Sequence, residues 1–199
     1  MQTNRFGPGR VLFAALAFGI VSSVASAAPI KWAVGDGGNG HSYEVVVVDG
    51  GILWNDAKVA AESAGGYLAV VTSTEESDFI YGLADPIDEV WDSSGINTLG
   101  PWLGGYQIQE GAWPWAWVTG ETWSDTFADE NWGSSQPSGN GDFLNIYGGG
   151  NSHGKQWNDY SDSVPGYVVE YVPEPGTIGL LTVGGLALMR RRRRRRVEE

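Results

Sequence analysis

Trp102-Leu103-Gly104-Gly105 is the first of several short motifs that follow one another through the second half of the 199-residue chain. The later motifs, in chain order, are Trp115-Ala116-Trp117-Val118, Asn131-Trp132, Gln136-Pro137-Ser138, Asp142-Phe143-Leu144-Asn145-Ile146, Gln156-Trp157-Asn158-Asp159 and Gly166-Tyr167-Val168-Val169-Glu170-Tyr171. Short apolar runs between glycines and prolines are typical of strands joined by turns. We therefore expect strands at residues 102–107, 115–118, 143–147, 156–157 and 167–171.

The first half of the chain has a different pattern, with two helices between strands. Residues 42–48 are rich in valine and predict a strand. Apolar side chains recur at helical spacing over residues 53–64, and the glycine pair at 65–66 ends that helix. A further strand is expected at 67–71. Ser73 with Glu76 predicts a capping box at the start of a second helix, which reaches about residue 83. Helices followed by a β-rich, loop-rich half predict an α+β domain.

The ordered set of motifs resembles the C-type lectin-like domain over residues 39–171, and the two helices fall where that family has them. The resemblance implies an α+β C-type lectin-like fold with two helices, short antiparallel strands and a long loop region. It also implies binding without catalysis. The chain has no cysteine for the usual disulfides, and Phe143 and Val169 stand where cysteines are often found. The loop at 85–99 is longer than usual.

The same resemblance places a calcium and sugar site at the Gln-Pro-Ser motif and the Asn-Asp pair. Calcium takes about six to eight oxygen ligands from carboxylates, amide carbonyls and water. The expected metal ligands are Gln136, Ser138, Asp142, Asn158 and Asp159. The expected carbohydrate-binding residues are Gln136, Ser138, Asn158 and Asp159. The family also implies a cis bond before Pro137, whereas Trp157 should point into the core because successive strand residues face opposite sides.

This predicted site departs from the family's sugar-binding motifs. Members that bind sugar usually carry Glu-Pro-Asn or Gln-Pro-Asp, and this chain has Gln-Pro-Ser. Gly141 stands where a glutamate usually precedes the Asp142 position. Lost carboxylates weaken the binding of a hard cation. Two interpretations follow. One is a secreted carbohydrate-binding module with calcium as cofactor. The other is a degenerate lectin-like domain for protein or matrix contacts, in which Asn158 and Asp159 serve loop hydrogen bonds without an ion.

Other residues of the chain do not predict a catalytic site. Residues 35–40 match G-x-G-x-x-G, but they precede a strand and lack the strand-to-helix context of a dinucleotide site. His41 and His153 are expected to be solvated. The acidic residues at 121–130 are expected in a solvated loop rather than as the carboxylate pair of a glycoside hydrolase. The tryptophans at 113, 115, 117 and 123 are expected to divide between core and surface, and an exposed pair could stack on a sugar.

The N-terminus reads as a secretory signal peptide at residues 1–27. Arg5 and Arg10 precede an apolar run at 11–24, and Ala25-Ser26-Ala27 is a small-residue cleavage site. Cleavage after Ala27 would leave residues 28–38 as a mature N-terminal extension.

The C-terminus carries a second targeting signal at residues 172–199. Pro173-Glu174-Pro175 is followed by an apolar stretch at 178–189 and an arginine run that begins at Arg190. Twelve apolar residues fall short of the about 20 that a spanning helix needs, so a transient anchor is expected. The three parts resemble the bacterial PEP-CTERM sorting tail. The resemblance implies recognition by an inner-membrane exosortase, transient anchoring there, and release to the cell surface or extracellular matrix.

The charge of the chain limits its partners. The formal net charge is −12, and residues 28–189 hold three lysines against 22 of the 24 acidic residues. Such a surface repels phosphate backbones, so no nucleic-acid partner is expected. The expected partners are a glycan or exopolysaccharide, the exosortase and secretion machinery, and transiently the inner membrane.

Overall fold

The computed structural model describes residues 24–26, 28–109 and 114–173. Its helices are α1 (Trp54–Ser63), α2 (Thr74–Ala84) and α3 (Asp125–Asn131), with short 3-10 helices η1 (Val34–Asp36) and η2 (Asp88–Val90). The strands are β1 (Val24–Ser26), β2 (Ile30–Lys31), β3 (Ser42–Ile52), β4 (Tyr67–Leu68), β5 (Thr98–Gln107), β6 (Trp115–Trp117), β7 (Phe143–Gly148), β8 (Gln156–Tyr160) and β9 (Val164–Tyr171). The predicted α+β class is confirmed, and a third helix joins the two expected ones.

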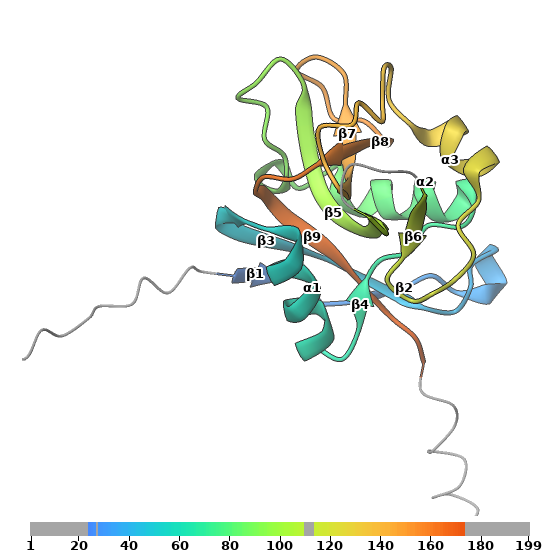
Figure 1. Cartoon of the computed structure of the whole chain (residues 1–199). Helices are drawn as coiled ribbons and strands as arrows, with labels where there is room; N and C mark the ends of the chain where they lie inside the picture. Colours follow the sequence, from blue (N-terminus) through green and yellow to red (C-terminus); the bar gives the residue numbers. More distant parts are fainter. Residues whose placement is uncertain (1–23, 27, 110–113, 174–199) are drawn as a thin grey trace, which may run out of the picture.

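The strands form one sheet with the order β1-β3-β9-β5-β7-β8. Three short strands lie off this path, because β2 pairs with β3, β4 with β9 and β6 with β5. Pairing is antiparallel except between β5 and β9, where Trp102 pairs with Tyr167 in parallel. Figure 1 shows β3 and β9 crossing the molecule beside α1, with β7, β8 and α3 gathered at the opposite end. The loop that carries the predicted site leads into β7 at Phe143, whose ring stacks on Trp54 at the start of α1 with centroids 4.5 Å apart.

Helix α1 follows from its sequence pattern. Trp54, Ala57 and Ala61 are buried, and their spacing of three and four residues puts them on one helical face. The small alanines let the helix approach β4 and β9 closely, whereas Trp54 reaches over and donates its indole N–H to the Leu103 carbonyl at 2.8 Å. One face of α1 is thereby fixed on the sheet.

Helix α2 begins as expected at Ser73, whose hydroxyl accepts from the Glu76 N–H at 3.2 Å. The reciprocal half of the predicted capping box is absent. The Glu76 carboxylate instead accepts from the Thr72 N–H at 2.7 Å and from the Tyr43 hydroxyl at 2.5 Å. Glu76 thus ties the start of α2 to strand β3.

Tryptophans carry much of the core. Trp54 and Trp102 belong to a cluster between α1 and the sheet. A second cluster extends to the loop-rich end and contains Trp91, Trp115, Trp117, Trp132 and Trp157. Rings of this size bury enough apolar surface to organise a small domain that lacks disulfides. The expectation that Trp157 points into the core is confirmed.

Candidate functional site

The Gln136-Pro137-Ser138 turn lies in the loop between α3 and β7. The Gln136–Pro137 peptide bond is cis, as the resemblance implied, and Ser135 just before it has a left-handed φ of 64°. Ser138 is exposed and Gln136 is half-buried. The turn therefore brings Ser138 to the surface and leaves Gln136 half-buried.

Asp159 holds this loop from strand β8. Its side chain is fully buried, with 0% exposure. Oδ1 accepts from the Ser138 N–H at 2.7 Å and from the Ser138 hydroxyl at 3.3 Å. Oδ2 accepts from the N–H groups of Gly139, Asn140 and Gly141 at 2.7, 3.1 and 3.3 Å. Four successive backbone N–H groups thus converge on one carboxylate, and charge-assisted bonds of this kind are stronger than neutral ones.

Gly141 makes that convergence possible. A Cβ atom at this position would lie 2.2 Å from the backbone N and Cα of Tyr160. The loop packs so closely on β8 that only glycine fits, and this is the position where the resembling family usually has a glutamate. The absence of a side chain at Gly141 is therefore what allows the loop to pack against β8.

Asn158 is also directed inward. Its amide nitrogen donates to Asn145 Oδ1 at 3.0 Å, and Asn145 in turn donates to the Ile146 carbonyl at 2.8 Å. Both asparagines are buried. The Gln136 Oε1 atom is buried too, and it finds no hydrogen-bond partner within the described ranges. Asp142, the remaining predicted ligand, lies half-exposed at the end of the loop, and its N–H donates to Ser161 Oγ at 3.0 Å.

These residues do not fit calcium in this arrangement. Calcium needs oxygen lone pairs that face the ion, but the Asp159 oxygens face N–H donors, and a cation there would meet the positive ends of four peptide dipoles. The Ser138 hydroxyl likewise donates to Asp159. Across residues 24–26, 28–109 and 114–173, no group of three or more His, Cys, Asp or Glu side chains is placed to hold a metal ion.

A second polar cluster lies at the far end of β3 and β9, and the sequence did not predict it. Glu76 and Glu170 are only 4% and 2% exposed. Tyr43 links them, since its hydroxyl lies 2.5 Å from Glu76 Oε1 and 3.3 Å from Glu170 Oε1. Glu170 also accepts from the Val70 N–H at 3.0 Å. The signal in the sequence was a lone acidic residue within the apolar run 167–171.

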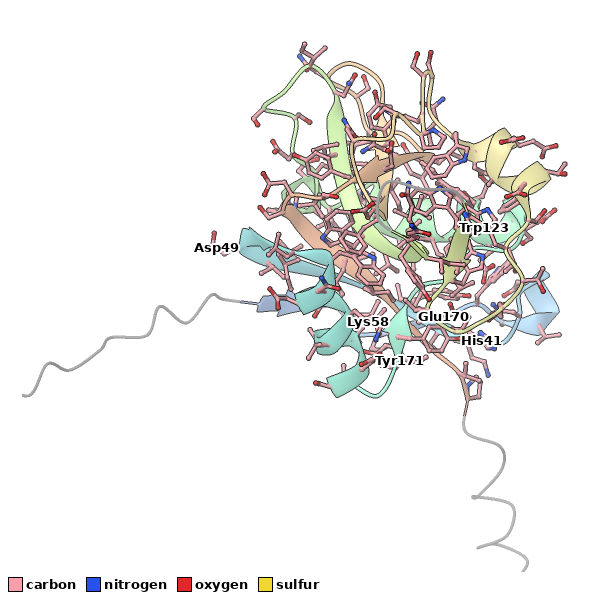
Figure 2. All side chains as sticks on the ribbon, viewed as in Figure 1. His41, Asp49, Lys58, Trp123, Glu170 and Tyr171 are labelled. Carbon is pink, nitrogen blue, oxygen red and sulfur yellow. The ribbon has the colours of Figure 1, made fainter. Side chains whose placement is uncertain are left out.

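His41 belongs to this cluster, so the expectation that it is solvated is wrong. Its Nδ1 lies 2.6 Å from Glu170 Oε1, and Figure 2 shows the two residues close together near the end of β9. Burial raises the pKa of Glu170, and the hydrogen bonds from Val70 and His41 oppose that rise only in part. Burial likewise raises the pKa of the Tyr43 hydroxyl. His153 is not free in solvent either, because its ring stacks on Trp91 at 4.4 Å.

The tryptophans divide as expected, and a hollow opens beside them. Trp115 and Trp117 are buried, whereas Trp123 is half-buried, and Trp113 lies outside the described residues. The hollow has a volume of about 240 Å³. It is lined by Pro114, Trp123, Asp125, Ala128, Asp129 and Trp132. Figure 2 shows Trp123 beside α3. The acidic residues at 121, 125, 129 and 130 are exposed, as expected, but those at 125, 129 and 130 lie in α3 and not in the expected loop.

Of the predicted sorting residues, Pro173 is exposed at the end of the described chain. Glu174, Pro175, Arg190 and the predicted apolar helix lie outside the described residues. At the other end, Val24–Ser26 of the predicted signal peptide form β1, but the remainder of that segment is not described. No helix in the part that the structure describes is both long and apolar enough to cross a bilayer.

Solved structures with similar folds are lectin domains and related proteins. The Kupffer cell C-type lectin receptor Clec4f is 26% identical with a TM-score of 0.51, over 70% of this chain and 83% of that chain. The C-type lectin domain of murine dendritic cell inhibitory receptor 2, solved in complex with N-glycan, is 20% identical with a TM-score of 0.51, over 67% and 91%. This chain has the C-type lectin fold.

A calcium-independent type II antifreeze protein also shares this lectin fold, at 15% identity and a TM-score of 0.50, over 74% of this chain and 96% of that chain. Residues 172–195 match the PEP-CTERM protein-sorting motif. The lectin-fold chain therefore carries the sorting signal of an exported protein. Comparison with curated proteins found no similar sequence.

Proposed function

We propose that the chain is an exported, cell-surface module that binds glycans without catalysis, through a loop that needs no calcium. The observation that carries the proposal is the Asp159 carboxylate, which fixes Ser138–Gly141 through backbone hydrogen bonds. In this scheme Asp159 does the work that a metal ion would otherwise do, because it holds the loop in one conformation. Gln136 and Ser138 are then the side chains that meet the sugar.

Several observations support this proposal. The PEP-CTERM motif directs the chain to the cell surface, where glycans are accessible. A neighbour of the same fold is described as a lectin in complex with N-glycan, and another as calcium-independent. Ser138 can donate and accept hydrogen bonds, and the unpaired Gln136 oxygen can accept one from a sugar hydroxyl once the side chain exposes it.

A second candidate function is a lectin-like scaffold for protein or matrix contacts. It is favoured by the burial of Asn158 and Asp159, which removes two of the four predicted carbohydrate-binding residues from the surface. Both candidates share the export route, the fold and the loop held by Asp159. They differ in whether the surface around Gln136 and Ser138 binds sugar.

A glycan array separates the two candidates. We expect the full-length chain to bind the same glycans in calcium and in EDTA, and Gln136→Ala to lose that binding. Gln156→Ala is the matched control, because Gln156 is an exposed glutamine at the start of β8. Binding that disappears in EDTA would contradict this proposal and support the calcium-dependent interpretation. No binding under either condition would favour the scaffold.

A further inference from the structure

The hollow beside α3 is lined by both aromatic and acidic side chains. Asp125, Ala128 and Asp129 are spaced by three and four residues, so they share one face of α3, and Trp132 follows directly after the helix. Trp123 forms another part of the wall and lies 6.4 Å from Trp132 between ring centroids, at an angle of 40°. One surface recess thus joins two indole rings and two carboxylates.

The tryptophan walls are fixed by the core behind them. Trp123 stacks on Trp115 with centroids 5.7 Å apart and also contacts Trp117 at 4.7 Å. Trp132 packs on Trp115 at 5.1 Å and is only 9% exposed. Rings held in this way lose little conformational entropy when a ligand arrives, which favours binding.

The two carboxylates have no counter-charge among residues 24–26, 28–109 and 114–173. Asp125 and Asp129 are exposed, and neither carboxylate accepts a hydrogen bond or forms an ion pair within the described residues. Lys58 is paired with Glu62, and Lys155 with Asp78. Of the three lysines between residues 28 and 189, only Lys31 on β2 remains. An arriving cation would therefore meet unneutralised negative charge.

We infer that this hollow binds a protonated amino sugar within a cationic polysaccharide. The flat C–H face of a pyranose can pack on an indole ring, and its ammonium group can pair with a carboxylate and interact with the ring faces. The volume of about 240 Å³ is below the roughly 300–1,000 Å³ of pockets for drug-sized ligands and suits one sugar unit. Trp123 provides the stacking surface, and Asp125 and Asp129 select the positive charge.

This site is separate from the Gln136–Ser138 turn and does not depend on the function proposed there. The hollow draws its walls from α3 and from the segments on both sides of β6, whereas the turn is held by β8. Its ligand is cationic and its recognition needs no metal. A polymer with many such units would also be attracted over longer range by the acidic domain.

The test compares two trisaccharides that differ in charge. The full-length chain is titrated in EDTA at about pH 6, where an amine is protonated, with the β-1,4-linked trimer of glucosamine and with its fully N-acetylated form. Calorimetry gives the affinity, and tryptophan fluorescence reports contact with the indoles. We expect the cationic trimer to bind about tenfold more tightly and to change the fluorescence.

Variants separate the site from general charge attraction. Asp125→Asn with Asp129→Asn should abolish the preference for the cationic trimer. Glu75→Gln with Glu130→Gln removes the same charge from exposed residues that do not line the hollow, and it should retain the preference. Gln136→Ala should retain it too, which distinguishes this site from the proposed glycan loop.

Three results with the trimers would overturn the inference. They are equal affinity for the two trimers, a preference that survives the double aspartate variant, and an equal loss in the Glu75 and Glu130 variant. Tighter binding of a lysine tripeptide than of the cationic trimer would also reject it, because the hollow would then recognise a protein side chain.

Discussion

At the scale of single residues, Asp159 has the role that the calcium-free interpretation of the sequence gave it, because its carboxylate accepts hydrogen bonds from the 138–141 loop. Its position in the Gln-Trp-Asn-Asp motif marked it as important, and the structure places it beside the predicted turn. Its partners are backbone N–H groups, which every residue except proline carries, so the sequence holds no signal for them. The location of Asp159 and its hydrogen bonding to the loop could be predicted from the sequence, but the individual donors could not.

Asp159→Asn should destabilise the fold by about 3 kcal/mol, because the amide loses the charge and turns an N–H donor toward other donors. Urea unfolding measures the change. Asp162→Asn is the matched control, since Asp162 is exposed and accepts only from the neighbouring Ser163 N–H. Equal losses in the two variants would contradict the role given to Asp159. Added calcium should leave the thermal midpoint of the unmutated chain unchanged.

Glu170 gives a pH dependence with a definite sign. Its folded pKa is raised above the ordinary value of 4.5, chiefly by burial. Its contribution to stability is therefore complete below that value and is lost as the pH rises through the raised pKa. Glu170→Gln cannot ionise, so the free energy of unfolding of the unmutated chain should rise relative to that of the variant as the pH falls through the raised pKa toward 4.5.

Urea titrations at several pH values test this prediction. Glu75→Gln, at an exposed position on α2, should show no such trend relative to the unmutated chain. Parallel stability curves for the unmutated chain and Glu170→Gln would show that burial does not perturb Glu170.

At the scale of elements, the periodic segments and the short strand β6 could be predicted, whereas α3 could not. Alanine spacing predicted α1 to within a residue at each end, and Ser73 predicted the start of α2. Helix α3 was missed, because its sequence is mostly polar and its seven residues depend on the Ser124 cap and the burial of Ala128. Strand β4 is shorter than the valine-rich run at 67–71 predicts. There, the Ala69 N–H bonds to the Val168 carbonyl at 2.9 Å and the Ala69 carbonyl accepts from the Gly104 N–H at 2.8 Å.

The 138–141 loop predicts a sharp effect of one methyl group. Gly141→Ala should destabilise the protein by more than about 2 kcal/mol, because the new Cβ overlaps the Tyr160 backbone. Gly149→Ala is the control, since nothing lies within 4 Å of a Cβ built there. Thermal unfolding compares the two variants. A stable Gly141→Ala protein would mean that the loop can move away from β8 at little cost.

At the scale of the whole molecule, a folded domain is followed by a sorting tail. The described lectin fold ends with β9 at Tyr171, and the matched motif begins at residue 172. Deleting residues 178–196 should therefore leave the fold intact and abolish membrane-linked sorting. Circular dichroism checks the fold, and cell fractionation checks the location. A truncated chain that is processed and located like the full chain would contradict the assignment of the tail.

Strand β1 has a consequence for maturation. Its residues Val24–Ser26 pair with Val46–Val48, and they belong to the segment expected to be cut off after Ala27. Cleavage there would strip one neighbour from β3 and leave a run of valines as an open sheet edge, the kind of edge that invites pairing with another strand. Hydrogen exchange at Val46–Val48 should then be faster in a chain that begins at Ala28 than in the precursor, and equal rates would mean that this edge stays covered. The exported form would thus differ from its precursor by an unpaired strand edge at Val46–Val48 of β3.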